Sequence, residues 1–438
     1  MPTFPKYESY KDSGVEWLGG IPSHWNFRRL KHIAKVRLSN VDKHSRANEL
    51  PVRLCNYTDV YYKDFITNEI AFMEATATEE QVHNFILEEG DVLITKDSES
   101  FDDIAVPAYV PETLKNVICG YHLAHIKPTH IEGSYLFRAF QAEGISSQFR
   151  VSANGITRFG IGKSAINDAV FLLPPVEEQK RIVEFLDRTT TEINRAISQK
   201  QRLIELLQEQ KAILINQAVT KGLNPNVPMR DSGIEWIGEI PEHWSANKLK
   251  YISKIFRGKF THRPRNDPRL YDGVYPFIQT GDVAKSGKFL TEYRQTLNEK
   301  GLRVSTLIPQ GTVVITIAAN IGDISILGFD ACFPDSVVGF QPKTDLDRDF
   351  LYYVLLSMKQ QFINTSTKNT QMNLNVDRIG SNFVPIPGLV EQQRIVEWIE
   401  DQLSDAAKAE TSLLRNINLL NEYRSIVISQ TVTGKIKV

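Results

Sequence analysis

The stretch DSGVEWLGGIPSHW at residues 12–25 returns as DSGIEWIGEIPEHW at residues 231–244, 219 positions further along the chain. A second repeated motif follows each copy. EQKRIVEF at residues 178–185 matches EQQRIVEW at residues 391–398, at an offset of 213. Self-similarity of this kind indicates a duplicated architecture. The chain therefore consists of two copies of one frame, each with an opening motif, a middle and a tail.

The two middles differ in length by a net six residues and share little sequence. Two copies with similar ends and different middles suit a protein that presents two different surfaces in equivalent positions. A plain duplication that later drifted is the alternative. It does not explain why the ends stayed alike while the middles diverged.

Each tail is predicted to be one long helix. Residues 176–219 contain neither proline nor glycine, and their apolar residues recur at steps of three and four, the pattern of a coiled-coil seam. The second tail repeats this pattern. Four polar seam positions interrupt it and are candidates for fixing the register: Lys200, Lys211, Glu410 and Arg424. Helix-starting prolines and helix-ending glycines frame both tails: Pro174, Pro175, Gly222, Pro387 and Gly434.

The two seams have no other long partner in this chain, so we expect them to pack on each other as an antiparallel coiled coil. Docking of a partner bundle is a second use of the same helices, and the two uses are compatible. The expected division is a first head at residues 1–174, a first helix at 175–221, a second head at 222–387 and a second helix at 388–438.

The middles are predicted to be α+β heads. Short apolar runs at Val92-Leu93-Ile94-Thr95, Ala105-Val106, residues 312–317 and residues 324–327 indicate strands. Residues 135–143 and 350–362 have helical patterns. The fold class is therefore α+β, with two globular heads, two long helices and a pseudo-twofold internal repeat.

Composition excludes several classes of protein. Apolar residues make up 42% and charged residues 24% of the chain, and the net charge is −1, as in an ordinary globular protein. The polar, proline-interrupted start does not resemble a signal peptide, and no apolar run reaches membrane-spanning length. The three cysteines, Cys55, Cys119 and Cys332, are far apart, which favours a reducing cytoplasm. We expect a cytoplasmic protein without a membrane span.

No motif predicts a catalytic centre. The GIGKS stretch at residues 160–164 resembles the end of a phosphate-binding loop, but Thr157 stands where that loop requires glycine. His122, His125 and His130 lack the further ligands that a metal shell needs. A methyltransferase motif is not found either. The chain is expected to be non-catalytic and to hold no metal or cofactor.

The two motifs, each present twice and in the same order, resemble those of the specificity subunit of type I restriction–modification enzymes, over nearly the whole chain. The resemblance implies that each middle is a target-recognition domain that reads one half of a bipartite, asymmetric site in double-stranded DNA. It also implies that the helices dock two methyltransferase subunits and, through them, restriction–translocase subunits. S-adenosylmethionine, ATP and magnesium would belong to those partners.

Local charge indicates where DNA would bind. Residues 245–304 hold 13 lysine and arginine residues against five acids, and residues 26–53 hold eight against two. Lysine and arginine hold phosphates, whereas arginine, asparagine, glutamine, serine and threonine read base edges. The candidates in the first head are Arg37, Asn40, Lys43, Arg46, Lys96, Ser98, Arg158 and Lys163. Those in the second head are Arg257, Lys259, Arg263, Arg265, Gln279, Thr280, Asn320, Gln371 and Asn373.

Two other functions stay open at this point. The chain is alternatively a duplicated coiled-coil adaptor whose heads bind proteins, or a nuclease or methyltransferase that acts alone. The repeated aromatic residues Trp17, His24 and Trp25, with Trp236, His243 and Trp244, could form a base-stacking surface. Because they recur in both halves, where specificity should differ, we interpret them as packing between the opening motif and the helix.

Overall fold

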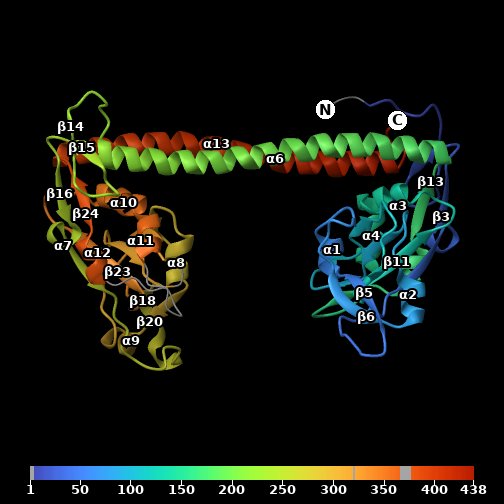
Figure 1. The fold of residues 1–438 in the computed structure, drawn as a ribbon, viewed down its shortest axis with the longest axis horizontal. Helices are drawn as coiled ribbons and strands as arrows, with labels where there is room; N and C mark the ends of the chain where they lie inside the picture. The colour runs from blue at the N-terminus through green and yellow to red at the C-terminus, as the bar shows by residue number, and fades with distance from the viewer. Residues whose placement is uncertain (1–3, 319–320, 366–375) are drawn as a thin grey trace. The chain divides into compact units, whose positions relative to one another are not determined.

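The computed structural model describes residues 4–318, 321–365 and 376–438. Within these ranges the chain forms two compact units. Unit 1 runs to Gln201 and adds Leu414–Val438, whereas unit 2 is Arg202–Leu413. The long helices α6 (Val176–Lys221) and α13 (Leu389–Val432) contribute to both units (Figure 1).

Unit 1 is an α+β head with two main sheets. One sheet has the order β4-β11-β7-β9 and is antiparallel, and the other has the order β10-β5-β6. Its strands are β1 (Tyr10–Asp12), β2 (Gly20–Pro22), β3 (Asn26–Arg29), β4 (Ala34–Leu38), β5 (Leu50–Cys55), β6 (Met73–Ala77), β7 (Val92–Thr95), β8 (Asp97–Ser98), β9 (Pro107–Tyr109), β10 (Val117–Cys119), β11 (Leu123–Pro128), β12 (Phe159–Gly160) and β13 (Val170–Leu173). Its short helices are η1 (Leu30–His32), α1 (Tyr57–Tyr61), α2 (Glu79–Phe85), η2 (Phe101–Asp103), α3 (Gly133–Phe140), α4 (Glu143–Ser152) and α5 (Lys163–Asp168).

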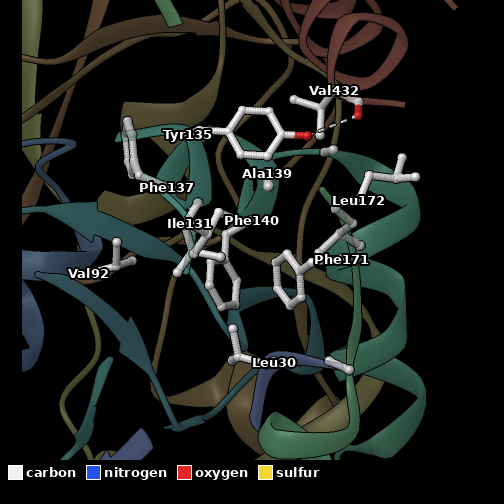
Figure 2. Close-up of a cluster of buried hydrophobic side chains, with 14 of the residues drawn as sticks. Leu30, Val92, Ile131, Tyr135, Phe137, Ala139, Phe140, Phe171, Leu172 and Val432 are labelled. Carbon is white, nitrogen blue, oxygen red and sulfur yellow. Dashed lines mark hydrogen bonds between the residues drawn. The ribbon is translucent and has the colours of Figure 1, made fainter. Parts of the chain in front are cut away.

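The end of the second tail completes the core of unit 1. Val427, Ile428 and Val432 of α13 are buried in the same cluster as the aromatic residues of α3. Figure 2 shows the Tyr135 ring beside Val432, and the Tyr135 hydroxyl donates a hydrogen bond to the Val432 carbonyl oxygen at 3.5 Å. The first head therefore depends on the last helix of the chain.

Unit 2 repeats this plan around one five-stranded sheet of order β17-β23-β21-β22-β19. Its strands are β14 (Met229–Asp231), β15 (Glu239–Pro241), β16 (Ser245–Lys248), β17 (Ser253–Arg257), β18 (Tyr271–Phe277), β19 (Phe289–Leu290), β20 (Gln295–Leu297), β21 (Val313–Thr316), β22 (Ile324–Leu327), β23 (Val337–Pro342) and β24 (Phe383–Ile386). Its short helices are α7 (Leu249–Ile252), η3 (Pro268–Leu270), α8 (Thr280–Lys285), α9 (Glu299–Arg303), α10 (Arg348–Ser357), α11 (Lys359–Thr365) and α12 (Val376–Ser381).

The α+β class of the heads is confirmed, although the expected helices at 135–143 and 350–362 are each divided in two, with breaks after Phe140 and Ser357. One expected strand is also corrected. Ala105-Val106 was expected to lie in a strand, but Ala105 has a φ of 60°, and the strand begins only at Pro107. A left-handed backbone at Ala105 breaks the extended conformation that a strand requires.

The antiparallel coiled coil is confirmed. In each unit α6 lies beside α13 (Figure 1). In unit 1, Arg424 donates a hydrogen bond to the Asn194 side chain at 2.7 Å, and in unit 2 the Lys211 and Glu410 side chains pair at 2.6 Å. Three of the four polar seam positions, Lys211, Glu410 and Arg424, thus bond across the helices, as residues that fix a register do. The seam residue Ile204 of unit 2 is only half-buried.

The repeated glutamine of the second motif locks each helix to its own head. Gln179 is buried, donates to the Pro174 carbonyl at 2.8 Å and accepts from the Glu132 main-chain N–H at 2.9 Å. Gln392 is buried in the same way, donating to Pro387 at 2.9 Å and accepting from Asp347 N–H at 2.7 Å. A buried side-chain amide needs hydrogen-bond partners. Here each glutamine also accepts from a main-chain N–H at the start of a short helix, α3 or α10, where such groups lack partners within the helix.

The second tryptophan and the histidine of each opening motif serve packing, as predicted, whereas Trp17 is 39% exposed. Trp25 and Trp244 are buried. His24 pairs with the Glu178 carboxylate at 2.9 Å, and His243 pairs with Glu391 at 3.0 Å, so each opening motif is tied to the start of the helix of its own repeat. Burial alone would raise the pKa of the Glu178 carboxyl, but hydrogen bonds to Tyr7 and His24 bring that pKa below its ordinary value.

The glycines that follow the long helices have the left-handed backbone predicted for them, with φ of 73° at Gly222 and 72° at Gly434. They differ in the space around them. A methyl group on Gly434 would lie 2.4 Å from Pro22 Cδ, whereas one on Gly222 would lie 3.1 Å from the Trp244 ring. At Gly434, both the left-handed backbone and the lack of space oppose a side chain. At Gly222, mainly the left-handed backbone does.

We expect Gly434→Ala to destabilise unit 1 by about 2–4 kcal/mol, from left-handed strain plus overpacking, and Gly222→Ala to destabilise unit 2 by about 1–2 kcal/mol, from strain. Hydrogen exchange resolved by peptide measures each unit separately, which a single melting curve does not. Equal loss of protection in the two variants would contradict the packing difference.

Candidate nucleic-acid interface

Strand register shows which positions of the two heads are equivalent. In unit 1, Lys35 on β4 faces Lys127 on β11, and in unit 2, Lys254 on β17 faces Gln341 on β23. The offsets on these paired strands are thus 219 and 214. The two heads therefore correspond residue by residue in their sheets, although no single offset aligns them.

The same comparison extends to two more strands. Thr95 of β7 faces Leu123, and Thr316 of β21 faces Val337, at an offset of 221. Ile118 pairs with Leu54 in unit 1, and Cys332 pairs with Phe277 in unit 2, at an offset of 223 between the strands β5 and β18. Four loops at the ends of these strands are therefore equivalent in the two heads.

These loops define one surface on each head. We call residues 38–45, 56–58, 96–98 and 120–122 loop face 1, and residues 257–265, 279–281, 317–318 and 334–336 loop face 2. In unit 1 the loops meet around a hollow of about 390 Å³ whose lining includes Lys43, Asn56, Tyr57, Tyr121 and His122. Polar and aromatic side chains thus surround an open depression.

Asp97 brings together His122 of loop face 1 and the neighbouring Arg158. Its carboxylate lies 2.7 Å from His122 Nδ1 and 2.8 Å from an Arg158 guanidinium nitrogen. Beside it, the Lys96 ammonium lies 4.3 Å from the centre of the Tyr121 ring. Burial lowers the pKa of that ammonium below its ordinary value. The predicted Lys96 and Arg158 are thus brought together, with two aromatic side chains that were not predicted.

The other candidates in the first head lie within loop face 1 or beside it. Arg37, Asn40 and Lys163 line a second hollow of about 520 Å³, in which Gln81 donates to the Asn40 side chain at 3.3 Å. Arg46 is exposed and pairs with Asp42 at 2.7 Å. Ser98 is buried, and its hydroxyl oxygen accepts a hydrogen bond from Tyr57 at 3.2 Å, so it supports that ring.

Asp335 gathers the arginines of loop face 2. Arg265 pairs with its carboxylate at 2.5 Å, the Arg263 guanidinium lies 3.9 Å away, and Arg257 donates to its main-chain carbonyl at 2.5 Å. All three arginines are exposed, as is Lys259. The structure therefore brings three arginine candidates of the second head together around one residue, Asp335.

The structure describes only some of the remaining candidates of the second head. Gln279 and Thr280 are half-buried at the start of α8, where Gln279 donates to the Gln295 side chain at 3.2 Å. Asn320, Gln371 and Asn373 lie outside the described residues. On the flank, a hydrogen bond from Arg269 holds the pKa of the Asp267 carboxyl well below its usual range.

In the described ranges, no group of three or more histidine, cysteine or acidic side chains could hold a metal ion. In the same part of the chain, no helix is both long and apolar enough to cross a membrane.

The family model of the type I restriction modification DNA specificity domain matches residues 22–205 and, again, residues 241–418. The chain belongs to this family of type I restriction–modification specificity subunits. It confers DNA sequence specificity on its enzyme and has no catalytic role of its own. The adaptor and the stand-alone enzyme are therefore no longer needed as explanations.

Curated relatives match the specificity subunit over most of its length. The putative MjaX specificity subunit of Methanocaldococcus jannaschii is 23% identical over 99% of this chain and 98% of the relative. The EcoBI specificity subunit of Escherichia coli is 21% identical over 67% of this chain and 64% of the relative. Both are type I restriction enzyme subunits by name.

Two solved structures share the fold. A chain from a structural study of complex assembly and conformational transition in a type I restriction–modification system aligns with a TM-score of 0.71 and 16% identity, over 95% of this chain and 99% of that chain. The HsdS subunit of Thermoanaerobacter tengcongensis aligns with a TM-score of 0.53 and 17% identity, over 95% and 98%. These likenesses support the fold of two repeated heads and long helices.

Proposed function

We propose that each head of this specificity subunit reads one half of a bipartite, asymmetric DNA site through its loop face. The observation that carries the proposal is that equivalent positions hold unlike side chains. Tyr121 and His122 in unit 1 correspond to Asp335 and Ser336 in unit 2, by the register of β11 and β23. Two heads of one frame with different contact groups select different half-sites. On this proposal the recognition domains are residues 1–174 and 222–387, and the helical segments are 175–221 and 388–438.

The candidate residues divide by chemistry into two roles. The exposed arginines and lysines suit phosphate contacts and guanine edges, whereas the amide and hydroxyl groups suit other base edges. Their present ion pairs with Asp97 and Asp335 are at the surface, where such pairs contribute little and exchange readily. A DNA phosphate can therefore replace or add to these carboxylates as the partner of an arginine.

The helices offer a docking surface for methyltransferase subunits. Leu206 and Ile213 of α6 are exposed, and the equivalent residues Leu419 and Ile426 of α13, at the offset of 213, are exposed as well. Exposed apolar pairs that recur in a duplicated frame suit two copies of one partner. We propose two methyltransferase subunits, with restriction–translocase subunits bound through them. S-adenosylmethionine, ATP and magnesium then serve those partners, and the assembly works in the cytoplasm with the DNA that it reads.

The test is sequencing of methylated motifs in DNA from cells that carry this chain with its methyltransferase subunit. We expect one motif with two unlike halves separated by unread base pairs. A palindromic motif, or methylation that does not depend on this chain, would overturn the proposal.

Asp335→Asn provides a sharper test of loop face 2. Without the carboxylate, we expect Arg263 and Arg265 to lose their fixed orientation, whereas Arg257 keeps its bond to the main-chain carbonyl. Discrimination at one half-site should then fall by about 1–3 kcal/mol. Non-specific affinity should rise, because the face gains net positive charge, and the slope of log Kd against log salt should steepen by up to about one unit. Both quantities are measured by titration of labelled duplexes over a range of salt.

Asp405→Asn is the matched control, since it removes the same charge from an exposed position on α13. Equal behaviour of the two variants would mean that net charge alone explains the effect and that Asp335 does not orient the arginines.

A further inference from the structure

Asn56 and Gln279 occupy the same position in the two heads. Asn56 directly follows β5, and Gln279 comes two residues after the end of β18, at the offset of 223 that the bridges of these strands give. This offset differs from those of the neighbouring strands, so the correspondence appears only in the structure. Each residue carries a carboxamide side chain, one methylene longer in Gln279.

The main chain at this position is held identically in both heads. The Asn56 N–H donates to the Asp59 carboxylate at 2.8 Å, and the Gln279 N–H donates to the Asp282 carboxylate at 2.8 Å. In each head this bond is one half of a capping box, in which the amide side chain in turn faces the main-chain N–H of the aspartate. The carboxamide oxygen therefore serves the helix start, whereas the carboxamide NH2 group is not used by the cap.

The surroundings of the amide differ between the heads. Lys96 and Ile317 follow the equivalent Thr95 and Thr316, and Tyr121 corresponds to Asp335. Sequence divergence has therefore changed the charge and size of the neighbouring contact groups while the carboxamide stayed.

Both amides have exchangeable partners. Asn56 lines the open hollow of loop face 1, and its Nδ2 lies 3.4 Å from the Leu54 carbonyl oxygen, a long hydrogen bond. Gln279 donates to the Gln295 side chain in an exposed contact at 3.2 Å. Neither contact is buried, and the capping aspartate holds the main chain by itself, so each side chain can exchange its cap and amide contacts for those of a ligand.

We propose that Asn56 and Gln279 are equivalent base-reading residues and that each recognises an adenine in its own half-site. A carboxamide donates to adenine N7 and accepts from the N6 amino group, a bidentate match that no other base offers in the major groove. The two half-sites then share an adenine at the corresponding place, although their other bases differ. This inference rests on the proposed function of the loop faces.

The experiment compares Asn56→Ala, Asn56→Asp, Gln279→Ala and Gln279→Glu in the full chain with its methyltransferase subunit, by methylated-motif sequencing. We expect each Asn56 variant to lose the choice of adenine at one position of one half-site, and each Gln279 variant to do so in the other half-site. Discrimination at that position should fall about five- to 150-fold. The half-site read by the untouched head is the internal control for folding and assembly.

Unchanged motifs, or relaxation at a position that is not an A·T pair, would overturn the inference. Were a variant to abolish methylation, competition binding of the purified complex to duplexes with single base-pair changes would give the same discrimination directly. If the wild-type chain itself gives no bipartite motif, the proposed function fails. If the wild type gives one and the variants leave it intact, only the adenine assignment fails.

Discussion

Exchanging residues 257–385 for the corresponding segment of another family member changes one half of the methylated motif and leaves the other half as it was. The segment carries all of loop face 2, from the end of β17 to β24, whereas the Gln392 lock and both long helices remain. Because the proposed base contacts come from the loops and the frame only positions them, specificity should move with the segment. Motif sequencing measures the outcome.

The matched control is the exchange of residues 38–172, which is the equivalent segment of unit 1 at offsets of 219 and 213. It should change the other half-site only. The donor segment must keep the volume of residues such as Phe350 and Leu351, which share the buried core of unit 2 with residues of both long helices. A change in both half-sites from either exchange would contradict independent heads.

The long helices and the repeat were predictable because their signals are local and periodic. A tail without proline or glycine, with an apolar residue at every third or fourth place, has few alternatives to a helix. The polar seam residues also behaved as expected, since Lys211 and Glu410 pair across the coiled coil. Glycine after each helix correctly indicated a left-handed residue at positions 222 and 434.

The loop faces were predictable only in part, because their geometry depends on pairing between strands far apart in sequence. Equivalent strands are offset by 214 to 223 residues, so the constant offsets of the motifs do not align Asn56 with Gln279. Charge counting found the arginines of the second head, but it could not show that Asp335, about seventy residues later, gathers them. It also missed Tyr57, Tyr121 and His122, whose residue types carry no charge signal.

The repeated glutamines illustrate a different limit. Gln179 and Gln392 were visible as conserved letters of the duplication, yet the N–H groups they accept from belong to Glu132 and Asp347, inside the divergent middles. A main-chain hydrogen-bond partner cannot be predicted from the sequence, since every residue except proline supplies an N–H group. The long helices thus bind two heads of different sequence through main-chain groups, so these contacts do not depend on the side chains of the heads.

Leu206→Asp combined with Ile213→Asp should remove one methyltransferase subunit from the assembly. Both side chains are exposed on α6, and burying each against a partner is worth about 1.5–3 kcal/mol, so their replacement by charged groups should weaken docking at least a hundredfold. Native mass spectrometry of the purified complex counts the subunits. We expect one to remain, held through Leu419 and Ile426.

Gln201→Asp combined with Ala212→Asp is the matched control, because both residues are exposed on α6 but the helical repeat places them on another face. This variant carries the same added charge and a similar loss of helix propensity, so it should keep both methyltransferase subunits. Loss of a subunit from the control as well would mean that charge on α6, and not the apolar pair, governs docking. Two retained subunits in the Leu206 and Ile213 variant would exclude this face from the interface, because a docking site that buries both side chains cannot accept two unpaired carboxylates.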